Sequence, residues 1–136
     1  MLPLTLYFDG GNEKQKATWA VVAKTGNIVV AKLAGLVPDH LPQTNNMAEW
    51  SALHMAVIFA YANRDSYIGF LIKGDSELVV KQVNKEYAVS KEHLKPLFKT
   101  CRQILDKMEK PCRILWIPRE ENSEADALGR IIRIQA

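Results

Sequence analysis

Four acids of this chain stand at positions where their carboxylates can meet at one site: Asp9, Glu49, Asp75 and Asp126. Asp9 and Asp75 each follow a β-forming run and precede small residues. If the two strands are parallel neighbours, the two carboxylates lie side by side at one sheet edge. Like charges that close repel unless a proton or a cation lies between them, and Mg²⁺ prefers oxygen ligands. The pair therefore indicates a divalent-metal site.

The other two acids lie near the starts of predicted helices. Glu49 follows Ala48, which belongs to the apolar face of its helix, so the Glu49 carboxylate borders the buried side and needs a partner. Asp126 lies in the first turn of the last helix. The informative feature is the arrangement of the four acids on two strand ends and two helix starts.

Each acid also has an ordinary structural interpretation. Asp9 before two glycines is typical of a turn, and Asp75 before Ser76 is typical of a helix N-cap. Glu49 could be a first-turn acid favoured by the helix dipole. Ser123 and Asp126 have the spacing of a capping box. Taken singly, none of the four acids proves a catalytic site.

The elements that must position these acids alternate along the chain. Predicted strands span residues 4–8, 17–23, 28–34, 67–72 and 113–117, and predicted helices span 45–63, 76–85, 90–110 and 122 onward. Asn45 or Asn46 is the expected cap of the first helix. A strand meander followed by strands alternating with helices implies an α/β fold with a mixed five-stranded sheet. We expect Trp19 and Trp116 in the core.

Composition narrows the class of protein. The chain has 136 residues, 48% hydrophobic and 24% charged, which fits a single folded domain over residues 1–136. No apolar run of about 18 residues suggests a membrane span, and the first residues lack the basic region of a signal peptide. Cys101 and Cys112 lack metal-ligand spacing, so we expect reduced thiols in a cytoplasmic protein. The net charge of +3 is compatible with a polyanionic partner.

Four segments resemble type 1 ribonuclease H, in order and over nearly the whole chain. They are YFDGG at 7–11, TNNMAEWSAL at 44–53, IKGDSELVVKQV at 72–83 and WIPREENSEADALGR at 116–130. Each segment is modestly specific, whereas the four together are specific. The resemblance implies the ribonuclease H-like fold, with strands ordered 3-2-1-4-5 and only strand 2 antiparallel. It also implies an endonuclease that hydrolyses the RNA strand of RNA/DNA hybrids, leaving 5′-phosphate and 3′-hydroxyl ends.

The resemblance assigns roles to the four acids. Asp9, Glu49, Asp75 and Asp126 would hold two Mg²⁺ ions, for which Mn²⁺ could substitute. Asp9 would bridge the two ions, and Asp126 would help hold the ion that activates water. Glu49 and Asp75 would hold the ion near the leaving group. Two ions about 3.5–4 Å apart can clamp the attacking and leaving oxygens of an in-line displacement.

Other residues resemble family positions that contact the nucleic acid. Asn45 and Asn46 correspond to residues that contact the minor groove. Gly10 and Gly11 would let the RNA strand approach the backbone, where a 2′-hydroxyl can be read. Thr44 resembles a residue that grips a DNA-strand phosphate.

The chain departs from the family pattern in three ways. Glu77 stands where many relatives have a glutamine that hydrogen-bonds a base edge, and an ionised carboxylate can only accept. The loop before Asp126 lacks the family's histidine. Arg119 is the first candidate to replace it, in an electrostatic role because arginine is not a base, with Glu120 and Glu121 as alternatives. The long basic, tryptophan-containing insertion between the middle helices is absent, which predicts a weaker grip on the hybrid.

A cationic stripe on the predicted long helix could supply the missing charge. Its members are spaced by four, four and three residues: Lys91, Lys95, Lys99 and Arg102. The functional interpretation is contact with phosphates and salt-dependent affinity. The alternative is an ordinary solvated helix face.

Two other functions stay open beside the hybrid-specific nuclease. A resolvase- or integrase-type DNA cutter can share the same fold. A catalytically silent nucleic-acid-binding module predicts that at least one acid is replaced, and here none is. We expect an RNA/DNA hybrid as the partner and a monomeric protein. Double-stranded RNA is left open as a further substrate, as is the preferred metal.

Overall fold

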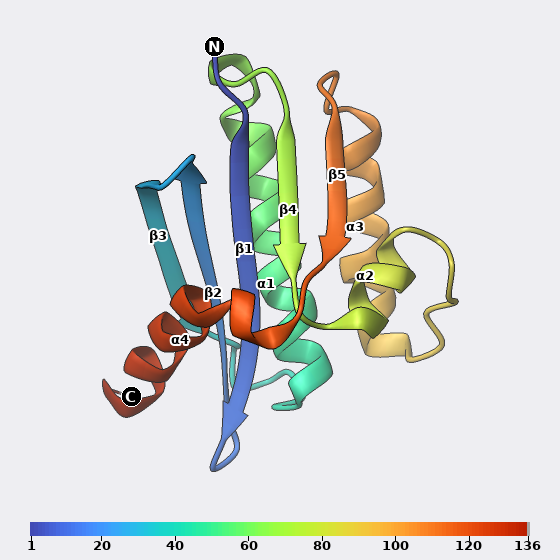
Figure 1. Cartoon of the computed structure of the whole chain (residues 1–136). Helices are drawn as coiled ribbons and strands as arrows, with labels where there is room; N and C mark the ends of the chain where they lie inside the picture. Colours follow the sequence, from blue (N-terminus) through green and yellow to red (C-terminus); the bar gives the residue numbers. More distant parts are fainter. Residues whose placement is uncertain (136) are drawn as a thin grey trace.

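The computed structural model describes residues 1–135, which build one five-stranded sheet with helices on both faces (Figure 1). The strands are β1 (Leu4–Glu13), β2 (Lys16–Thr25), β3 (Ile28–Leu36), β4 (Phe70–Gly74) and β5 (Cys112–Trp116). Their order is β3-β2-β1-β4-β5. β2 pairs antiparallel with β1 and β3, whereas β4 pairs parallel with β1 and β5. The predicted strand order and the single antiparallel strand are confirmed.

Four helices flank the sheet: α1 (Asn45–Ala62), α2 (Glu77–Val83), α3 (Lys95–Asp106) and α4 (Ser123–Gln135). α1 and α3 lie together on one face, and α4 crosses the other face over β1, β2 and β3 (Figure 1). Three short 3₁₀ turns join these elements: Arg64–Ser66, Glu92–Leu94 and Arg119–Glu121. Within residues 1–135, no helix is both long enough and apolar enough to cross a membrane.

Side chains of β1 and α1 pack against each other in the core between the sheet and α1. Leu4, Leu6 and Phe8 alternate along β1 and are fully buried, as the two-residue period of a strand requires. Trp50 of α1 is also fully buried, and its Nε1 donates to Gln82 Oε1 at 3.0 Å. This packing fixes the start of α1 beside the carboxyl end of β1.

The segment Asp9–Gly11, which we expected to form a turn, is part of β1. The β1–β2 ladder continues past Phe8, because Gly10 pairs with Trp19 and Gly11 with Thr18. Glycine is required at position 10, since a Cβ there would collide with the backbone of α1. The strand therefore carries Asp9 to the helix start instead of turning away.

Hydroxyl side chains cap both α1 and α2. Thr44 Oγ1 accepts from the Met47 N–H at 3.1 Å, so the expected cap at Asn45 or Asn46 is wrong. Ser76 Oγ accepts from the Val79 N–H at 3.4 Å. Thr44 and Ser76 both have the extended backbone of an N-cap. The Asp75 carboxylate is therefore not needed as a cap.

The long third helix is shorter than predicted. α3 begins at Lys95, after a 3₁₀ turn, and ends at Asp106. Pro96 lies in its first turn, where the missing N–H costs nothing, but proline cannot donate to a carbonyl one turn earlier. An α-helix starting at Ser90 is therefore interrupted.

The expected burial of Trp116 is wrong, and the last helix packs on the sheet through small residues. α4 buries Ala125 and Gly129, whereas Ile131 is 51% exposed. Small residues face the sheet because α4 packs closely on β2, with Thr18 and Ala20 next to Gly129. Trp116 is 48% exposed, because it ends β5 at the edge of the sheet.

Candidate active site

The four acids meet in one pocket, which we call the acidic pocket: Asp9, Glu49, Asp75 and Asp126 line it. Its volume is about 350 Å³. Asp9 comes from β1, Glu49 from α1, Asp75 from the residue after β4 and Asp126 from α4. One carboxylate oxygen from each of Asp9, Glu49 and Asp75 lies within 4.8 Å of the other two. Because β1 and β4 run parallel, Asp9 and Asp75 lie side by side where β4 ends, as predicted.

The two carboxylate oxygens of Glu49 differ in their hydrogen bonding. The Gly10 N–H donates to Glu49 Oε1 at 3.1 Å, which joins α1 to β1 at the pocket. Glu49 Oε2 is buried and has no hydrogen-bond partner within residues 1–135. A buried polar atom without a partner needs an explanation, and a cation between the carboxylates provides one.

The pKa values in the acidic pocket reflect crowding of like charges. Burial, together with the charges of Asp75 and Asp126, raises the pKa of Asp9 to about 7. Burial, followed by the charge of Asp9, raises the pKa of Glu49 well above its usual range. Burial also raises the pKa of Asp75. Asp9, Glu49 and Asp75 therefore give up their protons less readily than free carboxyl groups do, and a cation between them would favour their ionised forms. An all-oxygen donor set fits a hard divalent ion such as Mg²⁺ or Mn²⁺.

Asn122, which the sequence analysis missed, brings α4 to the pocket. Its side chain is buried, and Nδ2 donates to the Phe8 carbonyl of β1 at 2.9 Å. The Asn122 carbonyl in turn accepts from the Asp126 N–H at 3.1 Å. In the described part of the chain, no hydrogen bond links the Ser123 side chain to Asp126, so the capping-box interpretation is not supported. An asparagine at a helix start is normally a cap, so its sequence signal pointed elsewhere.

Three residues in the loop before Asp126 were candidates to replace the family's histidine: Arg119, Glu120 and Glu121. Of these, Arg119 lines the acidic pocket. Its positive charge and the Asn122 side chain oppose the rise in the pKa of Asp75. Glu121 lines a different hollow, beside Tyr7 and Lys24. The geometry thus puts the positive charge of Arg119, and neither Glu120 nor Glu121, at the wall of the acidic pocket.

The predicted substrate contacts divide into two groups. Gly10, Gly11, Asn45 and Asn46 line the acidic pocket. Thr44 does not line the pocket, and its hydroxyl caps α1 directly before Asn45.

Glu77 does not line the pocket. Its carboxylate lies 3.8 Å from Lys81 Nζ, one helical turn along α2. This ion pair lies within α2, and Glu77 is exposed, so its base-edge contact stays a prediction.

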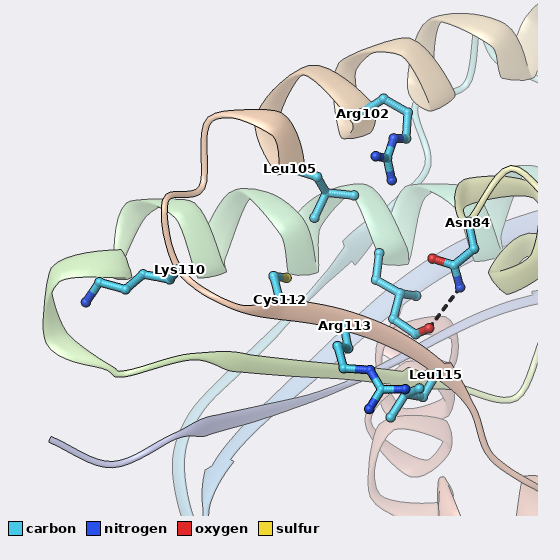
Figure 2. Close-up of a pocket in the computed structure, with 8 residues that line it drawn as sticks. Asn84, Arg102, Leu105, Lys110, Cys112, Arg113 and Leu115 are labelled. Carbon is cyan, nitrogen blue, oxygen red and sulfur yellow. Dashed lines mark hydrogen bonds between the residues drawn. The ribbon is translucent and has the colours of Figure 1, made fainter.

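The cationic stripe is not continuous. Lys91 precedes the 3₁₀ turn before α3 and is not part of the helix. Lys95 and Lys99 line a hollow between α3 and the segment that follows α2, which includes Lys85 and Tyr87. Arg102 lines a different hollow of about 400 Å³, which it shares with Arg113 of β5 (Figure 2). Its guanidinium donates to the Val83 carbonyl at 3.2 Å and to Asp106 at 3.3 Å.

Arg133 of α4 also lines the acidic pocket, and the sequence analysis missed it. It follows Asp126 by seven residues, which places both side chains on one helix face. That spacing is a sequence signal for the shared helix face, although it does not show that the Arg133 side chain reaches the pocket.

Comparisons with known proteins agree with this architecture. A family model described as reverse transcriptase-like matches residues 7–131. The chain is 33% identical over 87 residues to a candidate hydrolase named EbsB from Enterococcus faecalis (strain ATCC 700802 / V583). That match covers 64% of this chain and 63% of the relative, so the chain spans less than two thirds of that protein.

Two solved structures are similar over nearly their whole length. One is RNase H1 from the halophilic archaeon Halobacterium salinarum NRC-1, with 27% identity, a TM-score of 0.86, and coverage of 98% of this chain and 99% of that one. The other is LC11-RNase H1, isolated from compost by a metagenomic approach and solved with an RNA/DNA hybrid. It has 28% identity, a TM-score of 0.80 and coverage of 94% of each chain. The fold is thus ribonuclease H-like.

Proposed function

The chain belongs to the reverse transcriptase-like family, and from this premise we propose that it is a metal-dependent endonuclease that hydrolyses the RNA strand of RNA/DNA hybrids. The observation that carries the proposal is the convergence of four carboxylates in one open pocket, with a buried Glu49 oxygen left unpaired within residues 1–135. The similarity to RNase H1 structures, one of them bound to a hybrid, supports the substrate class.

In this proposal, Asp9, Glu49, Asp75 and Asp126 hold two Mg²⁺ or Mn²⁺ ions. Such ions supply Lewis acidity and a bound water of lowered pKa. The chain's own groups orient the ligands: the Gly10 N–H holds Glu49, and Asn122 holds the start of α4 against β1. Hydrolysis breaks the bond between phosphorus and the 3′-oxygen, so the products carry a 5′-phosphate and a 3′-hydroxyl.

Arg119 acts electrostatically in this proposal. Its guanidinium lines the pocket and offsets part of the rise that burial causes in the pKa of Asp75, and it cannot take up a proton. It therefore favours the ionised form of Asp75 and attracts the phosphate of the substrate, whereas proton transfer needs water or a carboxylate.

The substrate lies across the glycines and asparagines of the pocket wall. Gly10 and Gly11 offer backbone to the RNA strand, and Asn45 and Asn46 offer amides to base edges. Thr44 and Glu77 remain predicted contacts, as do the cations Lys91, Lys95, Lys99 and Arg102. We treat residues 1–136 as one ribonuclease H domain, of which Ala136 lies outside the described residues. A monomeric state, a cytoplasmic location and cleavage of double-stranded RNA stay predictions.

The test is cleavage of one labelled sequence presented as RNA/DNA hybrid, double-stranded RNA and double-stranded DNA, with Mg²⁺, Mn²⁺ or chelator. We expect metal-dependent cutting of the hybrid's RNA strand that is lost in Asp75→Asn. Asp65→Asn is the matched control, because Asp65 is exposed in the 3₁₀ turn after α1. Cutting of the DNA duplex would instead indicate a resolvase-like enzyme. Binding without any cleavage would indicate a silent binding module.

A further inference from the structure

Arg133 is held rigidly at the wall of the acidic pocket. Its side chain is only 11% exposed, and Nη1 donates to Thr18 Oγ1 of β2 at 2.6 Å. The guanidinium fills the space beside Gly11, where a Cβ would collide with it. Contacts with β1 and β2 therefore fix a planar donor group at the site before any substrate arrives.

The guanidinium of Arg133 is only partly paired with other groups of the protein. Glu13 Oε2 lies 3.6 Å from Nε, which is beyond hydrogen-bond distance, and the Glu13 side chain is 65% exposed. Nε is buried without a hydrogen-bond partner in residues 1–135, and Nη2 makes no hydrogen bond in that same part of the chain. A buried guanidinium with open donors is costly unless a ligand shares its charge.

Arg133 lies between two hollows. One is the acidic pocket, and the other is a hollow of about 300 Å³ whose walls include Lys14 and Lys16 of the β1–β2 hairpin. Cations thus continue from the pocket past Gly11 toward the hairpin. A strand that places one phosphate at the acids carries further phosphates on either side, and phosphates are what arginine and lysine bind.

We propose that Arg133, seated against Gly11 and backed by Lys14 and Lys16, is a phosphate-binding subsite for the RNA strand. The subsite holds a phosphate adjacent to the one that is cut. This inference rests on the proposed function, since the acids define where the cut phosphate lies. The exposed Glu13 moderates the charge of the subsite.

The first test compares Arg133→Met with Arg113→Met. Arg113 is exposed on β5 and lines the separate hollow of Figure 2, so it controls for the loss of one positive charge. For Arg133→Met we expect KM for the hybrid to rise roughly tenfold with kcat within about twofold. In an Asp75→Asn background, the slope of log affinity against log salt should fall by about one. Arg113→Met should change neither quantity.

A second measurement assigns the contact to a strand. A hybrid is prepared with one uncharged linkage in the RNA strand, moved one position at a time, and its binding is measured. In the Asp75→Asn protein, one position beside the cut site should weaken binding. In the double variant with Arg133→Met, that position should cost nothing further. The same series in the DNA strand should show no such coupling.

The outcomes separate the subsite from the proposed function. If the wild type binds hybrid but does not cut it, the proposed function fails, and the salt slope and linkage series still decide the subsite. Equal slopes for Arg133→Met and Arg113→Met at equal Tm overturn the subsite, as does absence of hybrid binding by the wild type. If Arg133→Met unfolds, the Glu13→Gln variant tests the subsite instead. Removing that acid should lower KM roughly two- to threefold, and an unchanged or higher KM overturns the proposal.

Discussion

At the residue scale, Glu49 shows how a side chain can be positioned by the fold and still be incomplete. Its Oε1 accepts from the Gly10 N–H, whereas its Oε2 is buried without a partner in residues 1–135. Burial and the charge of Asp9 raise its pKa. A carboxylate held in this way is unfavourable in the metal-free protein and favourable once a cation binds.

Glu49→Gln separates these two states. The glutamine oxygen can still accept from Gly10, so we expect the metal-free Tm to stay unchanged or to rise. The rise of Tm on adding Mg²⁺ should shrink, and hybrid cleavage should fall by roughly a hundredfold or more, because a metal ligand is lost. Glu86→Gln, an exposed acid after α2, is the control. Cleavage at the wild-type rate would remove Glu49 from the proposed metal ligands.

At the element scale, the approach of α1 to β1 is the contact that builds the site. Gly10 lies against the backbone of Ala48 and Glu49, and this contact brings the first turn of α1 to the strand. On the other face, α4 approaches β2 across Gly129 and is joined to β1 through Asn122. Two close helix–strand contacts therefore bring acids of α1 and α4 to the same pocket.

A pair of glycine substitutions tests these two contacts. A Cβ at Gly10 meets rigid backbone, so we expect Gly10→Ala to lower the free energy of unfolding by about 1–3 kcal/mol and to abolish cleavage. At Gly129 a Cβ meets its nearest atoms at 3.5–3.9 Å, which is ordinary contact. Gly129→Ala should be neutral or stabilise the helix by up to about 1 kcal/mol. Urea unfolding measures the free energy of unfolding of both variants. Equal changes in this free energy would contradict the close approach of α1 to β1 at Gly10.

At the scale of the whole molecule, repulsion in the acidic pocket links folding to pH and metal. The pKa of Asp9 is about 7 in the folded protein, above its ordinary value of 3.8. The folded state therefore binds this proton more tightly than the unfolded state does, and the metal-free protein loses stability as pH rises between these two values. A bound cation removes this effect, because metal and protons compete for the same carboxylates.

Thermal or urea unfolding at a series of pH values measures this linkage. Without metal, we expect the free energy of unfolding of the wild type, relative to Asp9→Asn, to fall by on the order of 3 kcal/mol from about pH 4 to pH 7. The comparison with Asp9→Asn cancels groups that do not interact with Asp9, such as His54, whose pKa is lowered by burial. With saturating Mg²⁺ the trend should reverse. A wild-type curve parallel to that of Asp9→Asn under both conditions would contradict the shifted pKa.

Local sequence was sufficient to predict which segments form strands and helices and to identify the four acids. The family resemblance predicted the strand order. Alternating and helical periodicities depend on neighbouring residues, and the segments around Asp9, Glu49, Asp75 and Asp126 carry their own motifs. Element ends were less accurate, because hydroxyl caps such as Thr44 and the first-turn Pro96 decide them through individual hydrogen bonds.

Only the tertiary structure decided which side chains complete the pocket. Asn122 resembles a helix cap in sequence, but its amide binds the carbonyl of Phe8, 114 residues earlier. Arg133 reaches the site because glycine at position 11 leaves room for its guanidinium. Trp116 is exposed because β5 is an edge strand. Each outcome depends on contacts between segments far apart in the chain, and local propensity carries no information about such contacts.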